Sequence, residues 1–191
     1  MINLEKIEKF RKDNKFANVY GFILFTSTHS NVVKVLNDDF YWRGFDEISK
    51  NWIIFSIKPE IGKYEYPSLP SGFLGMMVPI WKEPKANTKM IELFEIETTK
   101  KLPLFVAFIV KNEKQIDKIT YQLKDDNLDN ARNSIKSIIE SITSVVDLIL
   151  PEYYDTENVF RNVKQEIESK ITIEKIKKVI NLYKWLKELA P

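Results

Sequence analysis

The sequence contains no cysteine and only one histidine, His29. Without thiols the chain cannot form disulfides, use a thiolate nucleophile or bind a metal through cysteine. A single histidine leaves too few of the usual ligands for a transition-metal site, so we expect neither a metal nor a cofactor. The five glycines are scattered, and they form no glycine-rich loop that could hold a phosphate.

The sequence also lacks a large excess of positive or negative charge. It contains 29 Lys and Arg residues and 27 Asp and Glu residues, which give a net charge of +2. This balance gives no reason to expect nucleic acid or an anionic membrane as a partner. No apolar run approaches the roughly 20 residues of a membrane-spanning helix. Residues 1–11 are charged throughout and lack the apolar middle of a signal peptide. We therefore expect a cytoplasmic protein.

Short apolar runs alternate with amphipathic segments along the chain. Nearly unbroken apolar runs predict strands covered on both faces at residues 19–26, 52–57 and 104–110. An alternating run at 115–122 predicts an outer strand after a hairpin turn at 111–114. Spacings of three and four predict helices at 3–13, 32–37, 40–49, 86–98, 127–149, 156–169 and 172–189. This order indicates an α/β domain at 1–150 and a two-helix C-terminal extension at 151–191.

Residues 59–85 interrupt this alternation. They contain five of the eight prolines and three of the five glycines, as expected for a long irregular connection. Within them, residues 73–81 are apolar, rich in methionine and end at Trp81. This stretch either adapts to a partner or folds back over the domain. We favour the second interpretation because seven exposed apolar residues would promote aggregation, and we keep Trp81 as a candidate contact residue.

The first predicted strand ends in a polar elbow, which consists of Ser27, Thr28, His29, Ser30 and Asn31. Ser30 or Asn31 is placed to cap a helix that begins at Val32. Further along, Leu102 and Pro103 follow a helix and introduce the third predicted strand. The polar turn at 111–114 then follows that strand.

These features, in this order, resemble thioredoxin-like proteins over residues 15–150. In that family a Cys-x-x-Cys motif opens the helix after a buried strand, and here Ser27 and Ser30 stand about where the two cysteines would be. The family's cis-proline precedes a strand as Pro103 does, and it faces the elbow. The sequence departs from the family in its missing cysteines, its long segment at 59–85 and its added C-terminal helices.

The resemblance implies a mixed sheet flanked by helices, a cis bond at Pro103 and a groove for an extended peptide. Because both cysteines are missing, it implies no dithiol redox activity. We therefore expect a non-catalytic interaction module that binds a protein partner or associates with itself. The candidate binding residues are Ser27, Thr28, His29, Ser30, Leu102, Pro103 and Trp81. The alternative is a cysteine-free enzyme that activates a bound thiol from the Ser27 and Ser30 elbow, as glutathione transferases do with a hydroxyl.

Two further patterns have a functional and a plain interpretation. Ser27 or Ser30 beside His29 permits a nucleophile with a base, but residues this close in an elbow rarely reach that geometry. We expect a helix cap and an exposed loop histidine instead. The lysines of the last predicted helix, together with Trp185, permit binding to a membrane surface, an acidic groove or nucleic acid. Interspersed glutamates favour a solvated face of a helix packed on the domain or on a second subunit, and nucleic acid is disfavoured by the total charge.

Overall fold

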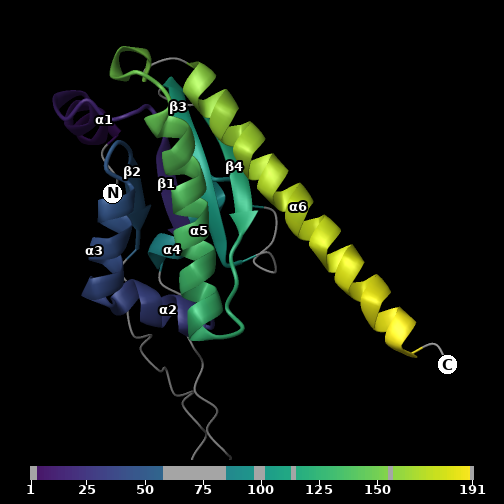
Figure 1. Ribbon diagram of the computed structural model, residues 1–191. Helices are drawn as coiled ribbons and strands as arrows, with labels where there is room; N and C mark the ends of the chain where they lie inside the picture. The colour runs from purple at the N-terminus through teal and green to yellow at the C-terminus, as the bar shows by residue number, and fades with distance from the viewer. Residues whose placement is uncertain (1–3, 58–84, 97–101, 113–114, 155–156, 190–191) are drawn as a thin grey trace, which may run out of the picture.

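The computed structural model describes residues 4–57, 85–96, 102–112, 115–154 and 157–189 (Figure 1). Its helices are α1 (Leu4–Asp13), α2 (Ser30–Asn37), α3 (Asp39–Ile48), α4 (Lys85–Leu93), α5 (Leu128–Asp147), the short 3-10 helix η2 (Pro151–Tyr153) and α6 (Glu157–Leu189). Its strands are β1 (Tyr20–Leu24), β2 (Ile53–Ser56), β3 (Leu104–Asn112) and β4 (Gln115–Gln122). Most of the predicted irregular connection, including Trp81, lies outside the described residues.

The four strands form one mixed sheet in the order β2-β1-β3-β4. β1 is parallel to β2 and antiparallel to β3, and β3 is antiparallel to β4. The predicted α/β class is therefore confirmed, and so is the position of β4 as an outer strand. β2 differs from the prediction of a strand covered on both faces. Its residues are only half-buried, because β2 lies at the edge of the described sheet.

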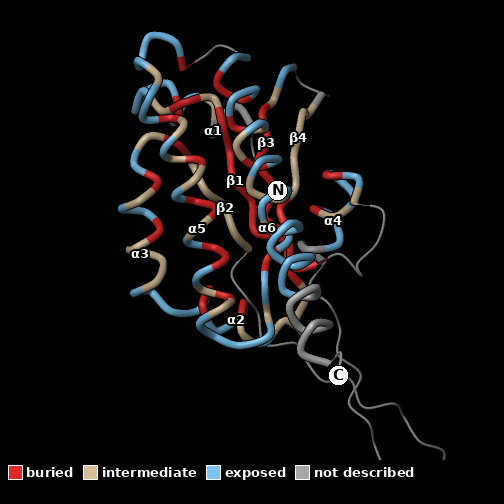
Figure 2. Tube along the Cα trace, turned by 45° about the vertical axis from the view of Figure 1, so that its right-hand side comes forward, coloured by how far each residue is buried: buried red, intermediate tan, exposed pale blue. Residues whose placement is uncertain are grey.

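Helices cover both faces of the central strands, which explains their unbroken apolar sequence. All five residues of β1 are buried (Figure 2). On one face, Ile23 and Phe105 pack with buried residues of α2, α3, α5 and α6. On the other face, Phe22 and Phe108 pack with Met90 of α4 and with Phe94. Figure 1 shows α5 crossing in front of the sheet and α4 behind it.

The larger of the two hydrophobic cores, on the face covered by α5, packs tightly because residue 21 of β1 is a glycine. A Cβ atom at this position would lie 2.5 Å from Phe105 Cζ and 2.8 Å from Trp52 Cζ3. These distances leave no room for any side chain, so the two aromatic rings occupy the space above the glycine. The Trp52 indole N–H also donates a hydrogen bond of 2.8 Å to Thr143 Oγ1 on α5, which fixes the helix against the sheet.

The C-terminal region corrects the predicted two-helix extension. Residues 157–189 form one continuous helix of 33 residues, α6. No glycine or proline occurs in this range, so the backbone has no reason to stop helical hydrogen bonding near residue 170. The first half of α6 also contributes to the larger core through four buried side chains, those of Val159, Phe160, Val163 and Ile167. None of the helices in the described ranges is long and apolar enough to cross a membrane.

Candidate functional site

The strand register brings the predicted elbow and the predicted proline to one end of the sheet. β1 and β3 run antiparallel, with Leu24 opposite Leu104. The elbow follows β1 and the Leu102-Pro103 pair precedes β3, so both leave the sheet at the same end. The Leu102-Pro103 peptide bond is cis, as the resemblance implies. Trp81, the remaining candidate residue, falls outside the described ranges.

Hydrogen bonds centred on Thr26 hold the elbow in one shape. The Thr26 backbone N–H donates to His29 Nδ1 at 3.0 Å, and Thr26 Oγ1 lies 2.7 Å from the same nitrogen. Thr28 Oγ1 is 2.7 Å from Thr26 Oγ1, and the His29 N–H donates to the Thr26 carbonyl at 3.0 Å. Because a backbone N–H only donates, Nδ1 must accept. Neutral His29 therefore carries its proton on Nε2.

This tautomer argues against the serine nucleophile with a histidine base. The Nε2–H group is a donor, so it cannot remove a proton from Ser27 or Ser30. The Nδ1 lone pair is engaged by Thr26 within the elbow itself. The side chain of His29 is half-buried rather than exposed. It orders the loop, and its geometry offers no base to a neighbouring serine.

The cap of α2 comes from a residue that the sequence did not indicate. Neither Ser30 nor Asn31 caps the helix, because α2 begins at Ser30. The Val32 N–H instead donates to Asp125 Oδ1 at 2.7 Å, and Asn31 Nδ2 donates to the Asp125 carbonyl at 2.7 Å. A carboxylate in this position also interacts favourably with the helix dipole. The sequence places Asp125 in a turn far from α2, and only folding brings the two together.

The loop that contains Asp125 also contacts the proline. The Pro103 carbonyl accepts hydrogen bonds from the Leu123 N–H at 3.0 Å and from Gln122 Nε2 at 2.9 Å. Leu102 and Pro103 are buried, and Leu102 belongs to the core beside α4. Thr28 and Ser30 are exposed. Among the described residues at this end of the sheet, Thr28 and Ser30 of the elbow are therefore exposed and polar, whereas the two predicted wall residues are buried.

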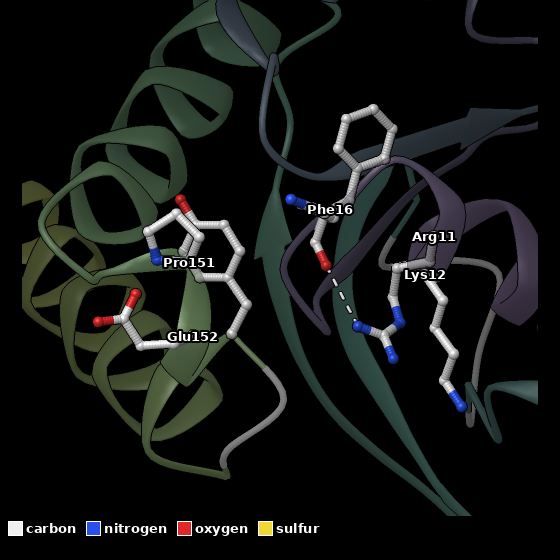
Figure 3. A pocket seen from close by; sticks show the side chains of 7 residues that line it. Arg11, Lys12, Phe16, Pro151 and Glu152 are labelled. Atoms are coloured by element: carbon white, nitrogen blue, oxygen red, sulfur yellow. Dashed lines mark hydrogen bonds between the residues drawn. The ribbon is translucent and has the colours of Figure 1, made fainter.

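A separate hollow of about 390 Å³ lies between the end of α1 and η2 (Figure 3). Its lining is Arg11, Lys12, Lys15, Phe16, Pro151, Glu152 and Tyr154. None of the predicted site residues lines it. The buried Arg11 guanidinium donates to Glu8 at 2.6 Å and to the Phe16 carbonyl at 3.2 Å.

The charged and polar side chains beside this hollow attach α1 to the sheet. The Tyr20 hydroxyl of β1 donates to Glu8 Oε2 at 2.8 Å. The hydrogen bond from Arg11 lowers the pKa of Glu8, and burial raises the pKa of Tyr20. Because Glu8 neutralises the charge of Arg11, the guanidinium is committed to this internal network. We assign the hollow no ligand.

Within the ranges described above, no group of three or more His, Asp and Glu side chains is placed to hold a metal ion. Comparisons with protein-family models, with curated proteins and with solved structures find no match. The elbow and its surroundings are therefore the basis for assigning a function.

Proposed function

We propose that this chain is a thioredoxin-like protein without dithiol chemistry, which binds a protein partner at the elbow end of its sheet. One observation supports the proposal: in the β2-β1-β3-β4 sheet, residues 27–30 follow β1 and the Leu102-Pro103 pair precedes β3 at the same end. The family resemblance implies that an extended peptide binds between these two elements. Because no known protein matches the chain, the proposal rests on this arrangement of residues 27–30 and Leu102-Pro103.

The chemistry of the elbow favours binding over catalysis. A serine hydroxyl does not ionise at neutral pH and cannot replace a thiolate without an activating base. His29 does not supply that base, because Thr26 engages its Nδ1. The exposed Ser30 hydroxyl can donate to and accept from a peptide backbone, and the exposed Thr28 hydroxyl, whose proton faces Thr26 Oγ1, can accept from it. Since the elbow is already ordered by its own hydrogen bonds, a partner would lose little free energy in fixing it.

The alignment with the family can be tested by restoring the cysteines. The double variant Ser27→Cys/Ser30→Cys should form an internal disulfide on mild oxidation, measured as the loss of both free thiols in an intact monomer. Ser141→Cys/Ser144→Cys is the matched control, with the same spacing inside α5. Its Cβ atoms, about 5–6 Å apart in a helix, are too distant for the roughly 3.5–4.5 Å that a disulfide requires. Two elbow thiols that stay free would contradict the alignment.

The binding site can be tested by photo-crosslinking in the native host. A photoreactive side chain at position 28 or 30 should capture the partner, whereas the same group at Asn133 or Lys136, exposed on α5, should not. A Thr28→Arg change should abolish capture from position 30 by placing bulk and charge on the elbow. Capture from α5 alone would contradict the proposal.

The enzymatic alternative makes a different prediction. A thiol-activating site should bind glutathione, so glutathione should raise the melting temperature of the protein. That shift should disappear in Ser27→Ala/Ser30→Ala. Such a pair of results would favour the enzyme over the interaction module.

A further inference from the structure

Helix α6 has two apolar faces that point in different directions. The first face consists of the four core residues Val159, Phe160, Val163 and Ile167, which are fully or almost fully buried. The second face consists of Ile173, Ile176, Val179 and Ile180, which are 52%, 52%, 66% and 47% exposed. At 3.6 residues per turn, the centres of the two faces lie roughly 145° apart around the helix axis. The second face therefore points away from the side that packs on the domain.

The change of face coincides with the point at which α6 leaves the body of the protein. Among the α6 residues up to position 181, Ile171 is the last that packs partly against the larger core. The carboxylate of Glu174 accepts a hydrogen bond from the Tyr121 hydroxyl of β4. Residues 175–181 are all exposed. In Figure 1 the yellow end of α6 extends beyond the sheet.

Charge separates the two halves of α6 as clearly as packing does. Residues 157–171 contain three basic and three acidic side chains and are neutral overall. Residues 172–189 contain five lysines and two glutamates, a local charge of +3 that exceeds the +2 of the whole chain. The five are Lys175, Lys177, Lys178, Lys184 and Lys187. The even charge of the complete sequence therefore conceals a basic, amphipathic segment at its end.

We propose that residues 172–181 of α6 lie on an anionic lipid surface, with the second apolar face in the interface and Lys175, Lys177 and Lys178 at the head groups. Aliphatic side chains along one side and lysines around the rest are the features of a helix that binds in the plane of a membrane. Anionic lipids attract each of these lysines. A second copy of the chain fits less well as the partner. Residues 172–189 of the two copies, each with a charge of +3, would repel one another across a shared apolar face.

The direction of the second face also suits a flat surface. Since this face is turned away from the side of α6 that contacts α5 and β4, a planar surface can reach it without meeting the sheet. An acidic groove on another protein would use the same lysines. It would have to enclose the helix, however, whereas residues 173–180 expose apolar side chains along one side only.

Co-sedimentation of the full chain with lipid vesicles tests the proposal. The protein should bind vesicles of phosphatidylcholine with about a third phosphatidylserine at least about tenfold more tightly than pure phosphatidylcholine vesicles, and added salt should weaken that binding. Ile176→Ser/Ile180→Ser should reduce the binding at least about tenfold, because the buried apolar area is lost. Lys175→Gln/Lys178→Gln should reduce the preference for anionic lipid.

Leu148→Ser/Leu150→Ser is the matched control. It removes two leucines that are 87% and 58% exposed, outside α6, and should leave vesicle binding unchanged. Circular dichroism and thermal unfolding establish that each variant is folded. The proposal is overturned if the full chain does not bind anionic vesicles or if the isoleucine variant binds as well as the wild type. A dimer that forms without lipid and needs Ile176 and Ile180 would assign the face to a second copy instead.

Discussion

The two halves of α6 share one backbone but have different surroundings. In the first half, the apolar face packs on α5 and β4, Lys164 forms an ion pair with Asp117 of β4, and the Lys170 ammonium donates to Ser137 and Ser141 of α5. In the second half, the apolar residues from Ile173 to Ile180 are largely exposed. The comparison teaches that helical continuity does not indicate where a domain ends. The direction of the apolar face instead shows which part of α6 packs on the sheet and on α5.

Truncation should separate the two halves most strongly. A chain that ends at residue 154 loses four buried apolar side chains, each worth about 1.5–3 kcal/mol, against a total stability of about 5–15 kcal/mol. It should show no cooperative unfolding by circular dichroism. A chain that ends at residue 175 retains Glu174 and should lose less than about 1 kcal/mol. If the chain that ends at residue 175 also failed to unfold cooperatively, the second half of α6 would belong to the domain.

Single substitutions should reproduce the contrast on a smaller scale. Phe160→Ala removes an aromatic side chain that is 2% exposed and should lower the free energy of unfolding by about 3–5 kcal/mol. Ile180→Ala removes a side chain that is 47% exposed and should change it by at most about 0.5 kcal/mol. Urea denaturation measures both values. Similar losses for the two variants would mean that Ile180 packs against the domain.

The same contrast explains which parts of the fold the sequence could predict. β1, β3 and α5 were predictable because their apolar patterns match the burial that each element receives. The predicted break in α6 was wrong for a physical reason. The apolar face rotates near residue 170, which looks like a boundary in the pattern, but no residue there ends the helix. The apolar run of β2 likewise indicated burial that an edge strand does not have.

The candidate site was predictable only in part. The order of elements placed residues 27–30 and Pro103 correctly at one end of the sheet. The contact that caps α2 was not predictable, because Asp125 reaches the helix from a position 93 residues further along the chain than Val32. No local sequence pattern predicts a contact between residues so far apart in the chain. The role of His29 also depends on the conformation of Thr26, which spacing alone does not specify.

The smallest effect should come from the junction of the two halves, where Tyr121 meets Glu174. Burial, and then the hydrogen bond and charge of Glu174, raise the pKa of Tyr121 above its ordinary value of 10.0. The folded state therefore keeps a proton that the unfolded state releases as the pH rises past 10.0. Stability from this tyrosine is complete below that pH and is lost above it.

Tyr121→Phe isolates this contribution. At neutral pH the variant should be less stable than the wild type by about 1 kcal/mol, because the hydrogen bond to Glu174 is lost. At about pH 11, ionisation of Tyr121 in the unfolded state alone should favour unfolding of the wild type by about 1.4 kcal/mol, so the difference should vanish or change sign. Chemical denaturation across this range measures the difference, in which the shared response of Tyr20 cancels. Parallel pH profiles would show that Tyr121 ionises as readily in the folded state as in the unfolded state, and hence that α6 does not seal the hydroxyl at this junction.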